Sequence, residues 1–197
     1  PQNYGYGNSY GNPAAAAYYY DSRENGFKTV FSAYAEASII PEKLKFKTSY
    51  NLDFYFYDAR NYSPEHNVGG SQGNATSALS KTYGYGTYHI IDNTLTYSDT
   101  KGPHSFSAML GQSTRMQYTA SLTGRANGVP GYDEQSKYLV NGSYKNQTTT
   151  DAASRYNGLS FFARGTYNYK DKYLATVTLR ADGSSKYQQK WGFFPSV

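Results

Sequence analysis

The sequence contains no cysteine and no long uninterrupted apolar run. The absence of cysteine excludes disulfides and thiolate metal sites. No apolar run approaches the roughly 18 residues that a membrane-spanning helix requires, so a helical span is excluded as well. Mean hydropathy is negative. This value is compatible with a membrane β-barrel, in which only alternate strand residues face lipid and the long loops are polar.

Groupings of residues typical of catalysis, metal binding or nucleic-acid binding are also lacking. His66, His89 and His104 are isolated, without a second histidine or a carboxylate at ligand spacing. No nucleophile, base and orienting group occur together, so we expect neither an enzyme nor a metal or cofactor site. The net charge of +5 is scattered rather than gathered in a basic stripe. A nucleic-acid partner is therefore not expected.

Aromatic residues and glycine, by contrast, are abundant, with 24 Tyr, 10 Phe and 19 Gly in 197 residues. This mixture is typical of transmembrane barrels, adhesive repeats and low-complexity segments. Residues 1–26 are rich in Tyr, Gly and Asn and are predicted to be a loop segment. The chain begins at Pro1 without Met or an apolar leader, which favours an internal piece of a longer protein.

From Phe27 onward, apolar and polar residues alternate with the period of two that β-strands have. Short turns around Pro41, Lys101 and Asp171 alternate with long polar connections over residues 58–82 and 119–157. Outer-membrane barrels show this rhythm, with tight periplasmic turns and extended outer loops. The predicted strands are residues 27–39, 44–57, 83–98, 105–118, 160–169 and 173–182. Tyr97, Tyr167, Tyr169 and Tyr173 lie close to the short turns, where an interfacial aromatic girdle is expected.

The charged residues of the predicted strands all lie on the face opposite the apolar one. A lipid-facing Arg or Lys at mid-bilayer costs roughly 2–4 kcal/mol, which explains the segregation. A soluble sandwich also segregates its faces, but its strands usually have about 5–6 residues, whereas these have ten to fourteen. Six strands are too few to close a barrel of this kind, so a larger wall is expected. The ten charges are Lys28, Glu36, Lys45, Lys47, Asp53, Asp92, Arg115, Arg164, Arg180 and Asp182.

Six residues on the polar face are candidate substrate contacts. Lys45, Lys47, Arg164 and Arg180 are predicted to point into the lumen, where they either contact substrate or solvate the interior and pair with carboxylates such as Asp53 and Asp182. Tyr55 and Tyr57, near an outer rim, either stack on a sugar or pack against a neighbouring strand or plug.

The second half of the chain contains three distinctive blocks, namely Asn168-Tyr169-Lys170-Asp171-Lys172-Tyr173-Leu174, Arg180-Ala181-Asp182-Gly183-Ser184-Ser185 and Trp191-Gly192-Phe193-Phe194-Pro195-Ser196-Val197. In this order they resemble the late barrel of SusC/RagA-type TonB-dependent transporters. The resemblance implies an all-β fold in which residues 27–197 form part of an antiparallel transmembrane β-barrel of about 22 strands, with a plugged lumen. The plug domain and the TonB-contacting segment are expected outside this fragment.

The resemblance also implies a function: energised nutrient uptake across the Gram-negative outer membrane of Bacteroidota-type bacteria. The expected partners are outer-membrane lipid, the TonB complex, a SusD-like surface lipoprotein, and a glycan or peptide substrate. Two other hypotheses stay open at this point. One is a Tyr- and Gly-rich extracellular β protein that binds a surface or glycan without transport. The other is a passive porin.

Overall fold

The computed structural model describes residues 13–67 and 73–197. The expected loop structure of residues 1–12, and the glycine-rich part of the first long connection at residues 68–72, lie outside this part of the chain. No helix among the described residues is long and apolar enough to cross a membrane.

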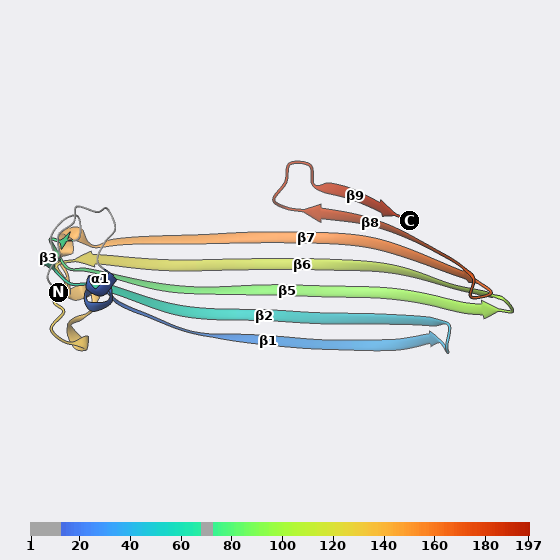
Figure 1. Ribbon diagram of the computed structural model, residues 1–197, viewed down its shortest axis with the longest axis horizontal. Helices are drawn as coiled ribbons and strands as arrows, with labels where there is room; N and C mark the ends of the chain where they lie inside the picture. The colour runs from blue at the N-terminus through green and yellow to red at the C-terminus, as the bar shows by residue number, and fades with distance from the viewer. Residues whose placement is uncertain (1–12, 68–72) are drawn as a thin grey trace. The chain divides into compact units, whose positions relative to one another are not determined.

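The described chain is dominated by one seven-stranded sheet, in which each strand pairs with the next strand of the same sheet along the chain (Figure 1). A small second sheet pairs two short strands antiparallel. The main-sheet strands, in spatial order, are β1 (Asp21–Ile40), β2 (Leu44–Ser63), β5 (Ala78–Lys101), β6 (His104–Asn127), β7 (Thr148–Tyr169), β8 (Tyr173–Ser184) and β9 (Trp191–Ser196). The other elements are helix α1 (Pro13–Tyr19), strands β3 (His66–Asn67) and β4 (Gly73–Asn74), and the 3-10 turns η1 (Glu134–Ser136), η2 (Leu139–Asn141) and η3 (Tyr144–Asn146).

The chain divides into two compact units, and the long strands contribute to both. The loop unit comprises the described residues of 1–27, 55–85 and 120–153, and therefore holds the first long connection and most of the second. The wall unit comprises residues 28–54, 86–119 and 154–197, and therefore holds all three short turns.

The short turns of the wall unit follow from their sequences. At Ile40-Pro41-Glu42-Lys43 the Lys43 amide donates to the Ile40 carbonyl at 3.1 Å, and Glu42 has a φ of 59°. Proline followed by a residue with positive φ is the arrangement of a type II turn. At the β7–β8 turn the Lys172 amide donates to Tyr169 at 3.1 Å, and both central residues have positive φ, as type I′ turns require.

The strands are longer than the alternation of apolar and polar residues predicts. The first strand begins at Asp21 rather than Phe27, β2 continues to Ser63, and β6 continues to Asn127. Much of the two connections expected over residues 58–82 and 119–157 is therefore paired strand, and the expected boundaries are corrected. The physical reason is that the ladder needs backbone groups rather than an apolar face. Polar side chains also pair across these extensions, as Ser22 does with Asn61 at 2.6 Å.

The loop unit has a small apolar core, although it consists largely of predicted connections. Tyr62, Leu79, Ala126 and Val129 are buried, and Leu139 packs against them. The Tyr62 hydroxyl donates to the Val129 carbonyl at 3.2 Å, which also accepts from the Ser77 hydroxyl at 2.7 Å. The connection after β6 is therefore anchored to the ends of β2 and β5 rather than independent of them.

Candidate functional site

The polar face of the wall unit is the candidate functional surface, since its strands align the charged residues that parity predicted to lie together. Lys28 and Asp53, on neighbouring strands, form an ion pair at 2.7 Å, and Lys45 lies 3.8 Å from Glu36. Asp53 therefore pairs with Lys28 rather than with Lys45 or Lys47. These contacts need both members of each pair on one face, as the parity argument requires.

Arg180, on β8, is the most constrained of the predicted candidates. Its Nε donates to both carboxylate oxygens of Asp182 at 2.8 Å, and its Nη2 donates to the Ser160 hydroxyl at 3.4 Å. Its guanidinium also lies 5.8 Å from the centre of the Phe162 ring. The predicted pairing with Asp182 is confirmed, and it holds the guanidinium in one orientation.

Lys45, Lys47 and Arg164 are all exposed on the same face. Lys47 lies 4.8 Å from the centre of the Tyr34 ring, a cation–π contact across β1 and β2. Arg164 makes no ion pair with any residue of the described chain, and stands opposite Thr178 in the ladder. The structure thus places these cations on the predicted face, and their contact with substrate stays a prediction.

Tyr55 and Tyr57 lie in the loop unit, on β2. Their rings stack with centroids 6.5 Å apart. The Tyr57 ring covers Gly84 of β5 so closely that a side chain there would collide with it. Tyr57 therefore packs against the neighbouring strand, one of its two predicted roles, whereas Tyr55 is 37% exposed. A sugar-stacking role stays a prediction for Tyr55.

Two adjoining hollows lie on the polar face of the wall unit, with volumes of about 390 and 650 Å³. Arg115 and Arg180 line both of them. Arg115 is one of the ten charges predicted on the polar face, but sequence reasoning missed it as a site residue. The signal that could have found it was its parity, which puts it on the face that Lys47 and Arg180 share.

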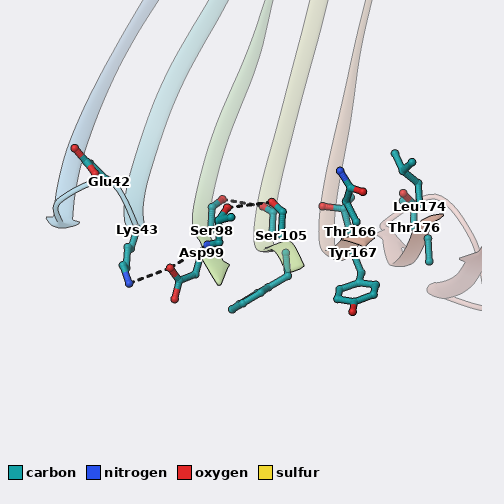
Figure 2. A pocket seen from close by; sticks show the side chains of 14 residues that line it. Glu42, Lys43, Ser98, Asp99, Ser105, Thr166, Tyr167, Leu174 and Thr176 are labelled. Carbon is teal, nitrogen blue, oxygen red and sulfur yellow. Dashed lines mark hydrogen bonds and ion pairs between the residues drawn. The ribbon is translucent and has the colours of Figure 1, made fainter. Parts of the chain in front are cut away.

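A third hollow, of about 530 Å³, lies at the short-turn end of the wall unit (Figure 2). Its lining is rich in hydroxyls, and the Ser98 hydroxyl donates to that of Ser107 at 3.0 Å. At its rim the Lys43 ammonium meets the Asp99 carboxylate at 2.9 Å (Figure 2). The lining serines and threonines are Ser98, Thr100, Ser105, Ser107, Thr166 and Thr176.

The opposite face of the wall unit is apolar and exposed. Leu110, Phe161, Val177 and Leu179 are between 47% and 61% exposed there. Large apolar side chains this exposed on one sheet face indicate a surface that meets an apolar environment.

Aromatic rings gather at the short-turn end of this apolar face, where the girdle was expected. Tyr97 lies 5.8 Å from Phe106, and Tyr169 lies 6.4 Å from Tyr173, between ring centres. The Tyr167 hydroxyl hydrogen-bonds His104 at 2.6 Å. Amphipathic rings of this kind suit the boundary between hydrocarbon and water.

The histidines make pairwise contacts with tyrosines. His66 stacks on Tyr19 in the loop unit at 4.3 Å, and His89 hydrogen-bonds the Tyr50 hydroxyl in the wall unit at 2.9 Å. No group of three or more His, Cys, Asp or Glu that could hold a metal ion occurs within residues 13–67 and 73–197.

A charge cluster in the loop unit fixes the connection between β6 and β7. Glu134 of η1 accepts from Arg60 at 2.7 Å and from Lys137 at 2.9 Å. These hydrogen bonds, that from Arg60 first, lower the pKa of Glu134 to about 2. Lys137 also donates to Asp21 at 2.7 Å, which raises the pKa of Lys137. The cluster joins η1 to the outer ends of β1 and β2, and sequence reasoning missed it because its members lie far apart in the chain.

These features define the class of the chain: a segment of an antiparallel β-wall with an apolar outer face, an aromatic boundary and a polar inner face. No known family profile matches the chain. Curated relatives do match. It is 32% identical over 131 residues to TonB-dependent receptor P26 of Formosa agariphila, covering 65% of this chain and 13% of the receptor. It is 26% identical over 192 residues to TonB-dependent receptor P39 of the same organism, covering 94% of this chain and 18% of the receptor.

Solved structures show the same fold. The RagAB peptide transporter matches with a TM-score of 0.80 at 16% identity, over 92% of this chain and 20% of that one. The RagAB peptide importer in its "open-open" state matches with a TM-score of 0.79 at 15% identity, over 92% of this chain and 20% of that one. The chain is a relative of TonB-dependent receptors, and its predicted resemblance to the SusC/RagA type is confirmed. The predicted fold class, an antiparallel transmembrane β-barrel segment, is confirmed with it.

Proposed function

We propose that this chain forms part of the wall of an outer-membrane importer that takes up glycans or peptides with energy supplied through the TonB complex. The observation that carries the proposal is the segregation of the wall unit, whose apolar face and charged face belong to one continuous ladder. Hydrocarbon on one side and a hydrated lumen on the other account for both faces. Residues 27–197 are assigned to the barrel domain as part of this proposal.

The relatives support the same reading in their names, which are those of TonB-dependent receptors and of a peptide importer. The chain spans about a fifth or less of each of them. The plug, the TonB-contacting segment and a SusD-like lipoprotein are therefore proposed for the complete protein. The residues proposed to face the substrate path are Lys45, Lys47, Arg164 and Arg180 of the wall unit and Tyr55 of the loop unit.

Two measurements on the full-length protein test the proposal. The protein is expected to fractionate with outer membranes and to need detergent to stay monodisperse. Cells that carry it are expected to accumulate labelled peptides or glycan oligomers only when TonB is functional. Uptake that continues without TonB would indicate a passive porin. Monodisperse protein without detergent would favour a soluble adhesive protein, and either result would refute the importer.

A further inference from the structure

Arg115, on β6, occupies the boundary between the two adjoining hollows of the polar face. Its side chain is exposed and makes no hydrogen bond or close ion pair within the described chain, and its one charge partner is the more distant carboxylate of Asp182. The other arginine that the hollows share, Arg180, is already held by Asp182 and Ser160. The guanidinium of Arg115 therefore keeps its planar set of donors available to a ligand.

The charges around Arg115 are unbalanced. Five cationic side chains line the two hollows against two carboxylates. Asp182 is committed to Arg180, and Asp92 makes no ion pair with any residue of the described chain. An excess of positive charge in a concave, partly desolvated surface raises the local concentration of anions. The cations are Lys47, Arg115, Arg180, Lys186 and Lys190.

The neutral lining of the hollows complements this charge. Ser113 and Ser160 are buried at 4% and 7% exposure, yet each lines one of the hollows. Tyr156 lines the larger hollow, as does Phe194, which stands opposite Arg180 in the ladder. Buried hydroxyls beside arginines, with aromatic rings nearby, are typical of ligand pockets in which a few polar groups orient the ligand and aromatic side chains contact the rest of it.

We propose that these hollows form a subsite for an anionic group, a carboxylate or sulfate, on an acidic oligomer, and that Arg115 is its principal contact. The inference rests on the proposed importer function and deepens it by naming the chemical class of substrate. Arg115 binds two oxygens of the anion through its guanidinium fork, while Lys47 and Lys190 contribute long-range attraction. An acidic glycan and an acidic peptide share this chemistry.

The test measures binding to the purified full-length protein, with its lipoprotein partner where one co-purifies, by isothermal titration in detergent. The probes are an oligogalacturonate, its neutral methyl ester, an oligoglutamate and an oligoglutamine. Arg115→Gln is expected to weaken binding of the preferred acidic oligomer about tenfold, or about 1.4 kcal/mol, because the variant loses a hydrogen bond to a charged group. The neutral probes should change less than about twofold, and Arg115→Lys should recover only part of the loss because it lacks the fork.

Arg155→Gln is the matched control, since Arg155 lies on the opposite face, 5.6 Å from the Tyr118 ring centre. It should leave all four probes unchanged. The acidic probe whose binding Arg115→Gln weakens, the oligogalacturonate or the oligoglutamate, identifies a glycan or a peptide as the source of the anion. The inference is overturned if wild-type protein shows no preference for either acidic probe, or if Arg115→Gln weakens acidic and neutral probes equally. It is also overturned if that variant lowers the melting temperature without changing selectivity, because Arg115 would then be packing against protein. TonB-driven uptake that shows no preference for acidic oligomers would overturn this inference and leave the proposed importer function intact.

Discussion

A lysine placed at Leu179 tests which face of the wall meets hydrocarbon. Leu179 is 55% exposed and stands between Ala163 on β7 and Pro195 on β9. It lies six residues beyond Tyr173 of the aromatic boundary, or roughly 20 Å along the strand at about 3.3 Å per residue. For a strand tilted by about 40°, this corresponds to a depth of roughly 15 Å, close to the middle of the hydrocarbon layer.

Leu179→Lys is therefore expected to destabilise the full-length barrel by about 2–4 kcal/mol, the cost of a lysine facing lipid at the bilayer midplane. At 25 °C this corresponds to a roughly 30- to 700-fold change in the folding equilibrium. Thr176→Lys is the matched control. Thr176 faces the polar side opposite Thr166, so the same charge should cost less than about 1 kcal/mol there.

The assay is a urea titration that measures the reversible unfolding of the full-length protein in lipid vesicles. Leu179→Ala, measured alongside, separates the loss of apolar contact from the cost of the charge. Equal effects of the two lysines would refute the assignment of the apolar face to lipid. A larger effect of Thr176→Lys would reverse it.

Two further predictions concern the loop cluster and the glycines. Because the folded pKa of Glu134 is lowered, its stabilising contribution is complete above its ordinary pKa of 4.5 and is lost as the pH falls towards about 2. In the wild type, hydrogen exchange over residues 128–147, corrected for the intrinsic rate, should become faster as the pH falls through that range. Glu134→Gln should show faster exchange already at neutral pH. Unchanged exchange in this variant would contradict the role of the cluster. Gly26→Ala should destabilise the fold by about 1–3 kcal/mol, because its new methyl group would lie 2.6 Å from the Phe56 carbonyl oxygen. Gly165→Ala, where nothing lies within 4 Å, should be neutral or stabilise by up to about 1 kcal/mol; unfolding titrations that rank the two glycines in the opposite order would refute this packing argument.

The sequence was sufficient to predict which residues lie on each face of the wall, because the alternation of side chains along a strand is a local property. Once Phe161 and Val177 are assigned outward, the side of Arg164 and Arg180 follows without knowledge of the partners. The pairing itself depends on register, which a periodic pattern does not determine. This is why Asp53 could not be matched to Lys28 in advance.

The loop unit was less predictable for a related reason. The extensions of β1 and β2 beyond the apolar alternation carry polar residues on both sides, so their strand character has no periodic signal. Arg60 and Glu134 are separated by 74 positions in the chain and meet only through tertiary structure. Likewise, only the structure distinguishes Arg115 from Arg164, which also makes no ion pair within the described chain, because Arg115 lines the two hollows and Arg164 does not.

The order of the strands has a consequence for how such a wall comes into being. Each strand of the main sheet pairs with the next strand of that sheet along the chain, and three of the six junctions between them span no more than three residues. Short closures lose little chain entropy and favour rapid, local pairing. Growth can therefore proceed by the addition of successive hairpins to an existing edge, and at each stage only the two edge strands of the sheet have unsatisfied backbone groups.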